Sequence, residues 1–282
     1  MMKTTICALA MLMITSILTG QDYFPTKDEI KQFTLSKTCV VLEEDPFSSY
    51  NSFIKDAVKA YWKMTPYEFI DATEFNNRRK DPQYSFIVLT QTNYERDKSN
   101  TLYNFINLLQ GKKVGRIGDM PQICAIPLSF AGEDDFEYSY KLGAILSFMQ
   151  KHAQMIADDP SSVGRKYLKF YNKNIPAVAN KTILVKKEDL APEIGSIEKI
   201  QAVYKNKIEI VTEEEIVKAI ENKAPNTLIL HKVGPVEGKN AGYCFKMLIG
   251  CDDADMYYYH HHLIENDAPN GFLLDDLKRL AK

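Results

Sequence analysis

The sequence lacks the short motifs that mark the commonest catalytic and nucleotide-binding sites. It has no GxSxG nucleophile elbow, no GxxxxGK[ST] phosphate loop and no GxGxxG dinucleotide fingerprint. The glycine-rich basic stretch 111–118 follows a helix-like segment and precedes a strand-like one, which is the reverse of a phosphate loop, so we expect an exposed loop there. Adjacent carboxylates in 43–45 are expected to be a solvated loop. No catalytic residue, metal ligand or cofactor site is therefore assigned.

An excess of positive charge is also missing. The 35 lysines and arginines face 37 aspartates and glutamates, for a formal net charge of −2. A protein that holds nucleic acid through its phosphates needs a basic face. The expected partner is therefore another protein or an envelope ligand, and nucleic acid is not expected.

Long apolar runs are absent apart from one near the N-terminus. After Lys3, residues 6–18 are nearly all apolar or small, which is the length of a secretory signal core and shorter than the roughly 20 residues that span a bilayer. The small Gly20 before the polar Gln21 favours cleavage between them, and a lipid anchor would require cysteine in place of Gln21. The sequence predicts a signal peptide over 1–20 and a mature chain in the periplasm or outside the cell, without a lipid anchor or membrane span. An uncleaved anchor is the alternative.

Cysteines are few and scattered. Four lie beyond the predicted signal peptide, and none belongs to a CxxC pair: Cys39, Cys124, Cys244 and Cys251. An exported protein can form disulfides, and three pairings of four cysteines are possible. Three of the four lie in strand-like segments, so we expect most of them to be buried thiols.

The first half of the chain alternates strand-like and helix-like stretches. Short apolar runs predict strands at 39–42, 67–70, 86–89 and 123–128, and apolar residues at helical spacing predict helices over 48–62 and 136–157. Asp71 with Glu74 is a helix-start pair, and Pro82 ends that helix. Pro127 predicts an edge strand or a bulge. The polar segment 93–122 is expected to be an insertion with one short helix, 102–109.

The second half repeats this order. Strands are expected at 182–185, 208–211, 228–230, 243–249 and 256–264, with helices over 194–204, after 212 and from 271. Thr212 with Glu215 is a capping box, and Pro225 ends its helix. Cys124 is expected to correspond to Cys244. The shared order predicts an internal duplication, with coincidence between two similar α/β units as the alternative.

These elements predict a mixed α/β fold. We expect two similar βαβαββ units, each a mixed sheet flanked by helices. The predicted units are 21–160 and 181–282, joined by a packed linker over 161–180.

The three consecutive histidines form the strongest candidate metal site. On a strand, His260 and His262 share a face with Tyr258, and two such histidines can bind zinc together with a third ligand. A hairpin that pairs Cys251 with Met256 would place His260 and His262 against apolar residues. His261 would then lie near Lys246. A one-residue slip would exchange the faces. Packed or solvent-facing histidines are favoured over a metal site, because no third ligand is evident.

Two further features have ordinary structural explanations. The aspartates of 252–255 lack the glycine and closing glutamate of a calcium loop, so a turn is expected. The chain has 16 tyrosines and 14 phenylalanines, and exposed aromatic rings favour recognition surfaces. Core packing is the expected use of most of them.

Several stretches resemble a group of exported tandem α/β proteins of the Bacteroidetes type. They are YWKMTPYEF at 61–69, YSF at 84–86, and GYCFKM at 242–247 with the tyrosine-rich strand that follows. The resemblance implies the location and the fold and carries no activity.

The sequence therefore favours an exported, non-catalytic envelope protein that binds a partner through its sheet edges or the cleft between its halves. A metal-dependent hydrolase that uses His260 and His262 is one alternative. A structural or stress-response component of the envelope is the other.

Overall fold

The computed structural model describes residues 24–45, 48–94, 96–162, 167–235 and 241–282. The predicted signal peptide and its cleavage after Gly20 lie outside the described residues.

The first unit is built on a five-stranded mixed sheet with the order β2-β1-β3-β4-β5. Its strands are β1 (Lys37–Val41), β2 (Tyr67–Ile70), β3 (Tyr84–Thr92), β4 (Tyr103–Gln110) and β5 (Gln122–Phe130). Strand β1 pairs in parallel with β2 and β3, whereas β4 runs antiparallel to β3 and β5. The strand pairs among β2, β1 and β3 are therefore parallel, and those among β3, β4 and β5 are antiparallel.

The second unit has the same topology. Its strands are β6 (Thr182–Val185), β7 (Ile208–Ile210), β8 (Thr227–Val233), β9 (Tyr243–Gly250) and β10 (Met256–Leu263). Their order is β7-β6-β8-β9-β10, again with parallel pairs around the first strand and antiparallel pairs beyond the third. The predicted α/β fold with two similar units is confirmed. Each unit has five strands, one more than the expected βαβαββ order.

The helix expected over 102–109 is wrong, because this segment is strand β4. It forms ladders with β3 on one side and β5 on the other, so tertiary pairing on both edges overrides the local helix-like pattern. Residues of β4 and β9 agree at a spacing of 140 residues: Tyr103 with Tyr243, Phe105 with Phe245, and Leu108 with Leu248. The expected equivalence of Cys124 and Cys244 is therefore also wrong, since Cys124 lies in β5 and Cys244 in β9.

Eight helices lie in the described residues, and two of them begin at the caps that the sequence indicates. They are α1 (Lys27–Thr34), α2 (Ser49–Tyr61), α3 (Ala72–Arg78), α4 (Phe136–Ser139), α5 (Leu142–Asp158), α6 (Ile197–Val203), α7 (Glu213–Glu221) and α8 (Leu274–Leu280). Asp71 accepts a hydrogen bond from the Glu74 N–H, and Thr212 and Glu215 bond each other's backbone N–H as a capping box. The helix expected over 136–157 is interrupted at Tyr140 and Lys141, which separate α4 from α5.

Short 3₁₀ segments complete the chain: η1 (Ile117–Asp119), η2 (Pro160–Ser162), η3 (Tyr167–Asn180), η4 (Lys187–Asp189) and η5 (Pro192–Ile194). The prediction that Pro127 marks an edge strand or a bulge is confirmed for β5. The strand lies at the edge of its sheet, and its register against β4 shifts next to Pro127.

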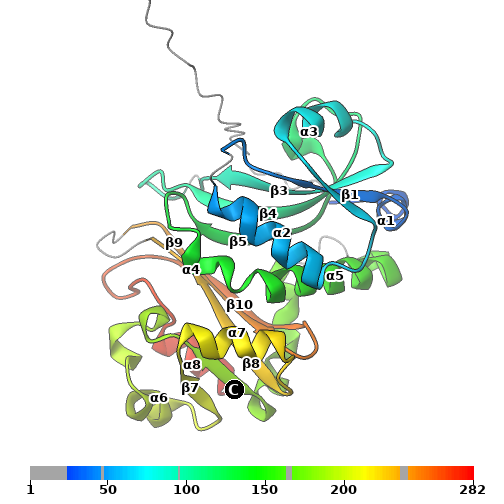
Figure 1. Cartoon of the computed structure of the whole chain (residues 1–282). Coiled ribbons are helices and arrows are strands. Elements are labelled where there is room, and N and C mark those ends of the chain that lie inside the picture. The colour runs from blue at the N-terminus through cyan, green and yellow to red at the C-terminus, as the bar shows by residue number, and fades with distance from the viewer. Residues whose placement is uncertain (1–23, 46–47, 95, 163–166, 236–240) are drawn as a thin grey trace, which may run out of the picture.

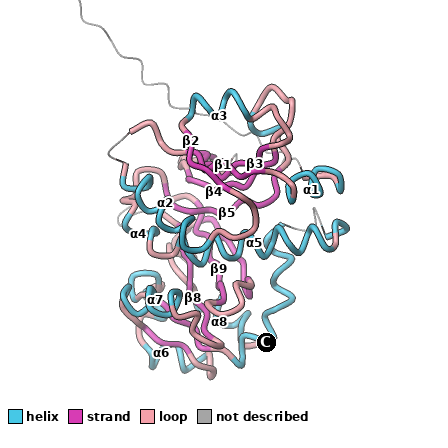
Figure 2. Tube along the Cα trace, turned by 45° about the vertical axis from the view of Figure 1, so that its right-hand side comes forward, coloured by secondary structure: helices cyan, strands magenta, loops and turns pink. Residues whose placement is uncertain are grey.

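The two units are stacked with helices between their sheets (Figure 1). Phe75 of α3 packs on the outer face of the first sheet, and α6 and α8 pack on the outer face of the second through Ile200 and Leu277. Between the sheets, α2, α5 and α7 share one apolar cluster with strands of both units. Figure 2 shows the same succession of layers from a second direction.

Helix α5 is buried between the two units and packs against both of them. Its first five residues, 142–146, are all buried, which a helix with one solvent-facing side does not show. The contact between the units is thus a packed apolar cluster at the place where the sequence suggested a cleft.

Side chains cover the inner edges of both sheets. The Asn172 amide in η3 donates to the Tyr259 carbonyl oxygen (3.0 Å) and accepts from the Tyr259 N–H (2.7 Å), and Asn174 donates to the Met256 carbonyl oxygen. In β5, the Pro127 carbonyl oxygen accepts from His231 Nε2 of the other unit (3.0 Å). An uncovered strand edge is a template for pairing with another chain. These contacts reduce that possibility at β5 and β10.

Candidate functional site

The register of the histidine strand differs from the expected one. His260 pairs with Lys246, His261 with Phe245 and His262 with Cys244, after an irregularity between Met256 and Tyr258. One residue of slip exchanges the two faces of a strand. His260 and His262 therefore face α8 and its carboxylate rather than apolar residues, and the expected positions against Met247 and Phe245 are wrong.

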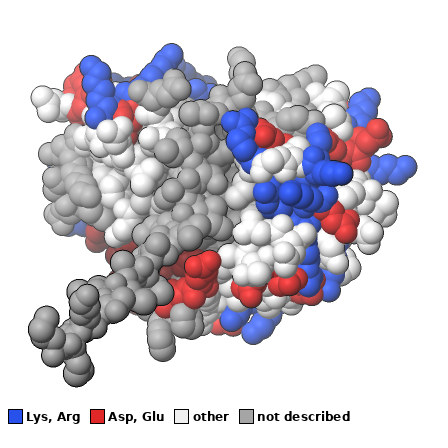
Figure 3. Space-filling model, turned by 90° about the horizontal axis from the view of Figure 1, so that it is seen from above, with Lys and Arg blue, Asp and Glu red and all other residues white. Residues whose placement is uncertain are grey.

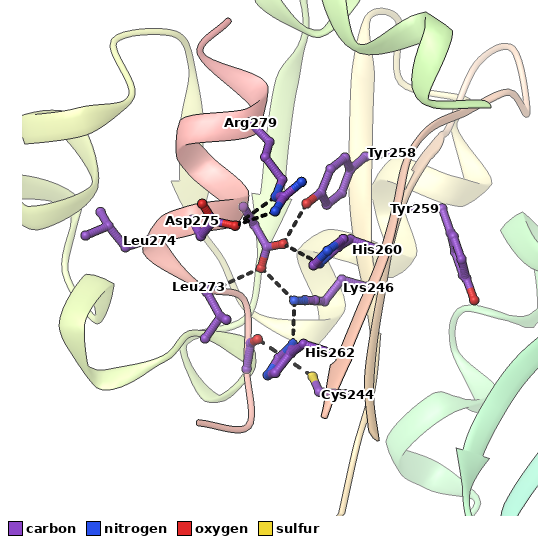
Figure 4. A network of polar contacts seen from close by, with 12 residues as sticks. Cys244, Lys246, Tyr258, Tyr259, His260, His262, Leu273, Leu274, Asp275 and Arg279 are labelled. Carbon is purple, nitrogen blue, oxygen red and sulfur yellow. Dashed lines mark hydrogen bonds and ion pairs between the residues drawn. The ribbon is translucent and has the colours of Figure 1, made fainter. Parts of the chain in front are cut away.

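A polar network of hydrogen bonds and ion pairs occupies this face (Figure 4). Lys246 Nζ donates to Asp276 Oδ2 at 2.8 Å, with both side chains almost fully buried. The Asp276 carboxylate also accepts from the Tyr258 hydroxyl (2.6 Å) and the Leu273 N–H (2.8 Å). His260 Nδ1 lies 3.3 Å from Asp276 Oδ1. Burial alone would raise the pKa of Asp276, but His260, Lys246 and Tyr258 hold that pKa well below its usual range.

His262 is held as a neutral ring with both nitrogens engaged. Lys246 Nζ donates to Nδ1 at 2.8 Å, and Nε2 donates to the Pro269 carbonyl oxygen at 3.0 Å. Burial and the Lys246 charge lower the pKa of His262 to about 4. A zinc ligand needs a free nitrogen lone pair, and here neither nitrogen offers one. Among the described residues, no group of three or more histidine, cysteine, aspartate or glutamate side chains could hold a metal ion.

His261 lies on the opposite face, together with Tyr259, which Figure 4 shows pointing away from the network. Its ring packs 5.7 Å from the rings of Tyr243 and Phe245 and 5.8 Å from that of Tyr259. Burial, followed by nearby positive charge, lowers the pKa of His261 to about 4. The expected position near Lys246 is wrong, and the ring belongs to the aromatic contact between the units.

The other sequence candidates have structural roles. Segment 252–255 forms the hairpin turn, where Asp253 accepts from the Asp255 N–H and pairs with Lys181. The four cysteines in the described part of the chain are unpaired: Cys39, Cys124, Cys244 and Cys251. Cys39, Cys124 and Cys244 are buried, whereas Cys251 is half-buried and its partial burial raises its pKa to about 12. Loop 111–118 carries Arg116, which pairs with Asp119.

The sequence analysis missed a second polar site, which lies where the first unit meets the second sheet. We call it the lysine cluster, and its members are Lys141, Lys186, Lys232, Asp189 and Tyr140. Lys186 and Asp189 follow β6, Lys232 lies at the end of β8, and Tyr140 and Lys141 come from the first unit. Parallel strands β6 and β8 are adjacent, and the chain leaves β6 first toward β7 and later returns to β8. Open α/β sheets bind ligands at this point, outside the carboxyl ends of the strands.

The ion pairs of the lysine cluster are loose. Lys141 Nζ lies 3.5 Å from Asp189 Oδ2, and Lys232 Nζ lies 4.0 Å from Asp189 Oδ1. Both distances exceed the 2.7–3.2 Å typical of an N–H···O hydrogen bond. The Lys141 side chain is only 3% exposed, so it has exchanged water for an incomplete set of protein partners.

Two polar atoms of the lysine cluster are buried without a hydrogen-bond partner among the described residues. They are Asp189 Oδ2 and the Tyr140 hydroxyl. The Nζ atoms of Lys141 and Lys186 lie over the Tyr140 ring, 4.9 and 5.4 Å from its centroid, which stabilises both charges. Buried polar atoms are normally hydrogen-bonded, so these two require an explanation such as a ligand or ion.

Positive charge is in excess in the buried part of the lysine cluster. The ammonium groups of Lys141 and Lys232 flank the Asp189 carboxylate, and the ion-pair partners of Lys186 are the more exposed Glu137 (3.7 Å) and Glu213 (3.6 Å). Nearby Glu133 accepts from the Phe130 N–H, and burial raises its pKa. The two innermost lysines, Lys141 and Lys232, therefore share a single ion-pair partner, Asp189.

In the first unit an acidic side chain lies at the start of helix α2. The Asp135 carboxylate accepts from the Tyr50 N–H there (2.9 Å), where Ser48 makes no side-chain cap. A helix N-terminus favours an anion, and Asp135 supplies one.

A sequence signal for the lysine cluster existed in β8. His231 and Lys232 interrupt an otherwise apolar strand, and His231 is buried. Burial and the positive charge of Lys141 lower the pKa of His231 to about 3. The convergence of Lys232 with Lys141 and Lys186 depends on how the units pack, which periodicity does not report.

Charges on the upper surface are mixed in sign (Figure 3). Basic atoms gather toward one side of this face, with acidic atoms among them. Around α3, Arg78 pairs with Glu68 and Glu74. None of the helices in the described residues has the length and apolar content that a membrane crossing requires.

Comparison with known proteins adds no relative: no family model matches the chain, and neither the curated proteins nor the solved structures contain a match.

Proposed function

We propose that the chain is an exported, non-catalytic envelope protein that binds a ligand at the lysine cluster. In this proposal the mature protein is free in the periplasm or outside the cell and carries no lipid anchor. One observation carries it: the cluster leaves the Tyr140 hydroxyl and Asp189 Oδ2 buried without hydrogen-bond partners among the described residues, at the carboxyl ends of β6 and β8.

An exposed aromatic ring beside the cluster supports the proposal. Phe136 is 59% exposed and contacts Phe53 edge-to-face, with ring centroids 5.0 Å apart. It is followed directly by Glu137, a partner of Lys186. Exposed aromatic rings are enriched at recognition surfaces. A ligand held by the lysines would have an apolar surface available next to them.

The sheet edges are weaker candidates for a binding surface. Asn172, Asn174 and His231 already engage the backbone of β10 and β5. The outer edge strands β2 and β7 are short, with four and three residues. Short edge strands offer little backbone for another chain to pair with.

The test is native mass spectrometry of the mature chain, Gln21 to Lys282, after incubation with a small-molecule extract of bacterial cell envelopes. We expect one retained mass per chain, retained poorly by Lys232→Met and normally by the surface variant Lys59→Met. Failure of the wild-type chain to retain any mass would contradict the proposal. Reproducible turnover of the retained compound, abolished by a single substitution, would contradict its non-catalytic part.

A further inference from the structure

We infer that the lysine cluster binds an oxyanion, a carboxylate or phosphoryl group of the ligand; this deepens the proposed function and rests on it. The cluster brings the ammonium groups of Lys141 and Lys232, from two units, to one buried carboxylate, and Lys186 shares the Tyr140 ring with Lys141. Ammonium groups are strong point donors to carboxylate and phosphate oxygens, at about 2.8 Å when the pair is well made.

Lys141 is the central donor of the site. Its side chain is 3% exposed, yet its ion-pair partner Asp189 Oδ2 stands 3.5 Å away. Elsewhere in the same protein, buried Lys246 reaches Asp276 at 2.8 Å and His262 at 2.8 Å. The chain can therefore give a buried lysine two close acceptors, whereas the ion pair of Lys141 is longer. An oxyanion would supply the acceptors that Lys141 lacks.

Lys232 and Tyr140 provide the second and third contacts. Lys232 Nζ lies 4.0 Å from Asp189 Oδ1, and its side chain is 14% exposed. The Tyr140 hydroxyl is buried without a partner among the described residues, and it can donate to an oxygen. Lys186 lies between the more exposed Glu137 and Glu213. Lys141, the most buried of the three lysines, would hold the anion.

Asp189 competes with the ligand in this arrangement. It is the buried carboxylate shared by Lys141 and Lys232, and an entering oxyanion would take over both lysines. Removing its charge should therefore strengthen anion binding. Two unpaired lysines would attract anions in Asp189→Asn even if the cluster served folding alone, so binding to the wild-type chain is the decisive observation.

The experiment uses inorganic phosphate and acetate as probes on the mature chain. Each is titrated calorimetrically and compared with chloride at equal ionic strength, and thermal unfolding is followed in parallel. Binding to the native state should raise Tm by about 2 °C or more at saturating probe. A preference for phosphate over acetate would indicate a phosphoryl ligand, and the reverse a carboxylate.

Four variants locate the effect. Lys141→Met and Lys232→Met should weaken probe binding about tenfold or more, Tyr140→Phe should weaken it less, and Asp189→Asn should strengthen it. Lys59→Met, at an exposed lysine paired with Asp56, should bind as the wild type does. Tyr140→Phe and Asp189→Asn keep the side-chain volume, so they report on the site even if a lysine variant fails to fold.

The inference is overturned if wild-type protein responds to phosphate and acetate no more than to chloride, or if Asp189→Asn binds more weakly. Retention of an uncharged envelope compound would overturn it while leaving the proposed function intact. Conversely, if phosphate binds at the cluster but no envelope compound is retained, the inference stands and the proposed ligand-binding role fails.

Discussion

The backbone N–H of Tyr243 donates to the hydroxyl of Tyr103, so the first residues of two equivalent strands meet where the units join. The Tyr103 ring also packs 5.3 Å from that of Phe245. The preceding residue, Gly242, has a φ of +106°, and a Cβ there would collide with the Tyr103 hydroxyl. This contact joins the two sheets at one end of β4 and β9.

We expect Tyr103→Phe to destabilise the protein by about 1–3 kcal/mol, because it leaves the Tyr243 N–H without its acceptor. Urea unfolding measures the change. Tyr67→Phe, at the half-buried start of the outer strand β2, is the matched control and should change the free energy of unfolding by less than about 0.5 kcal/mol. Equal effects of the two variants would contradict a specific role for the Tyr103 hydroxyl.

Asp276→Asn should destabilise by about 3–5 kcal/mol, because it leaves Lys246 buried without a carboxylate. The control lies one residue earlier in the same helix. Asp275→Asn breaks an exposed pair with Arg279 and should cost less than about 1 kcal/mol. Replacing both partners, as Lys246→Met with Asp276→Leu, should recover part of the loss, and a double variant worse than the sum of its single changes would argue against this account.

Stability should fall between about pH 6.5 and pH 4. Burial lowers the pKa to about 4 for His152, His261 and His262, and to about 3 for His231. The unfolded chain protonates these rings near pH 6.5, so protons favour unfolding in that window. Each ring contributes up to about 1.4 kcal/mol per pH unit. The raised pKa of Glu133 means that its protonation favours the folded state as the pH falls. This single group opposes four histidines.

Urea unfolding at pH 7, 6 and 5 measures this slope. The variant His231→Gln should be less dependent on pH than the wild type, because one titrating ring is removed. A free energy of unfolding that does not change from pH 7 to pH 5 would show that the rings are not neutral in the folded protein.

Added zinc should leave thermal unfolding unchanged, because Lys246 and Pro269 already occupy both nitrogens of His262. Elemental analysis of the untagged mature chain tests the same point without added metal. One ion per chain that disappears in His262→Ala would overturn this prediction and support the metal-dependent hydrolase alternative.

Asn172→Ala should remove both hydrogen bonds to Tyr259 and uncover part of the β10 edge. We expect a loss of about 1–3 kcal/mol and concentration-dependent association, measured by urea unfolding and analytical ultracentrifugation. Asn180→Ala, at the exposed end of η3, is the control. A monomer of wild-type stability would show that η3 does not protect this edge.

The sequence by itself determined the features that depend on neighbours along the chain. Apolar runs located nine of the strands, and the side chains of Asp71 and Thr212 marked two helix starts. These signals are local, because a cap bonds a residue three positions away and an apolar run reports burial of its own strand. The export, the duplication and the resemblance remain predictions.

Only the tertiary structure decided what depends on partners far along the chain. Strand β4 exists because β3 and β5 pair with it on both sides. A one-residue irregularity in the last hairpin turned His260 and His262 toward Asp276, a carboxylate the sequence pattern did not place there. The lysine cluster arises in the same way. Lys141 and Lys232 belong to different units, and they share Asp189 only because α5 packs between the two sheets.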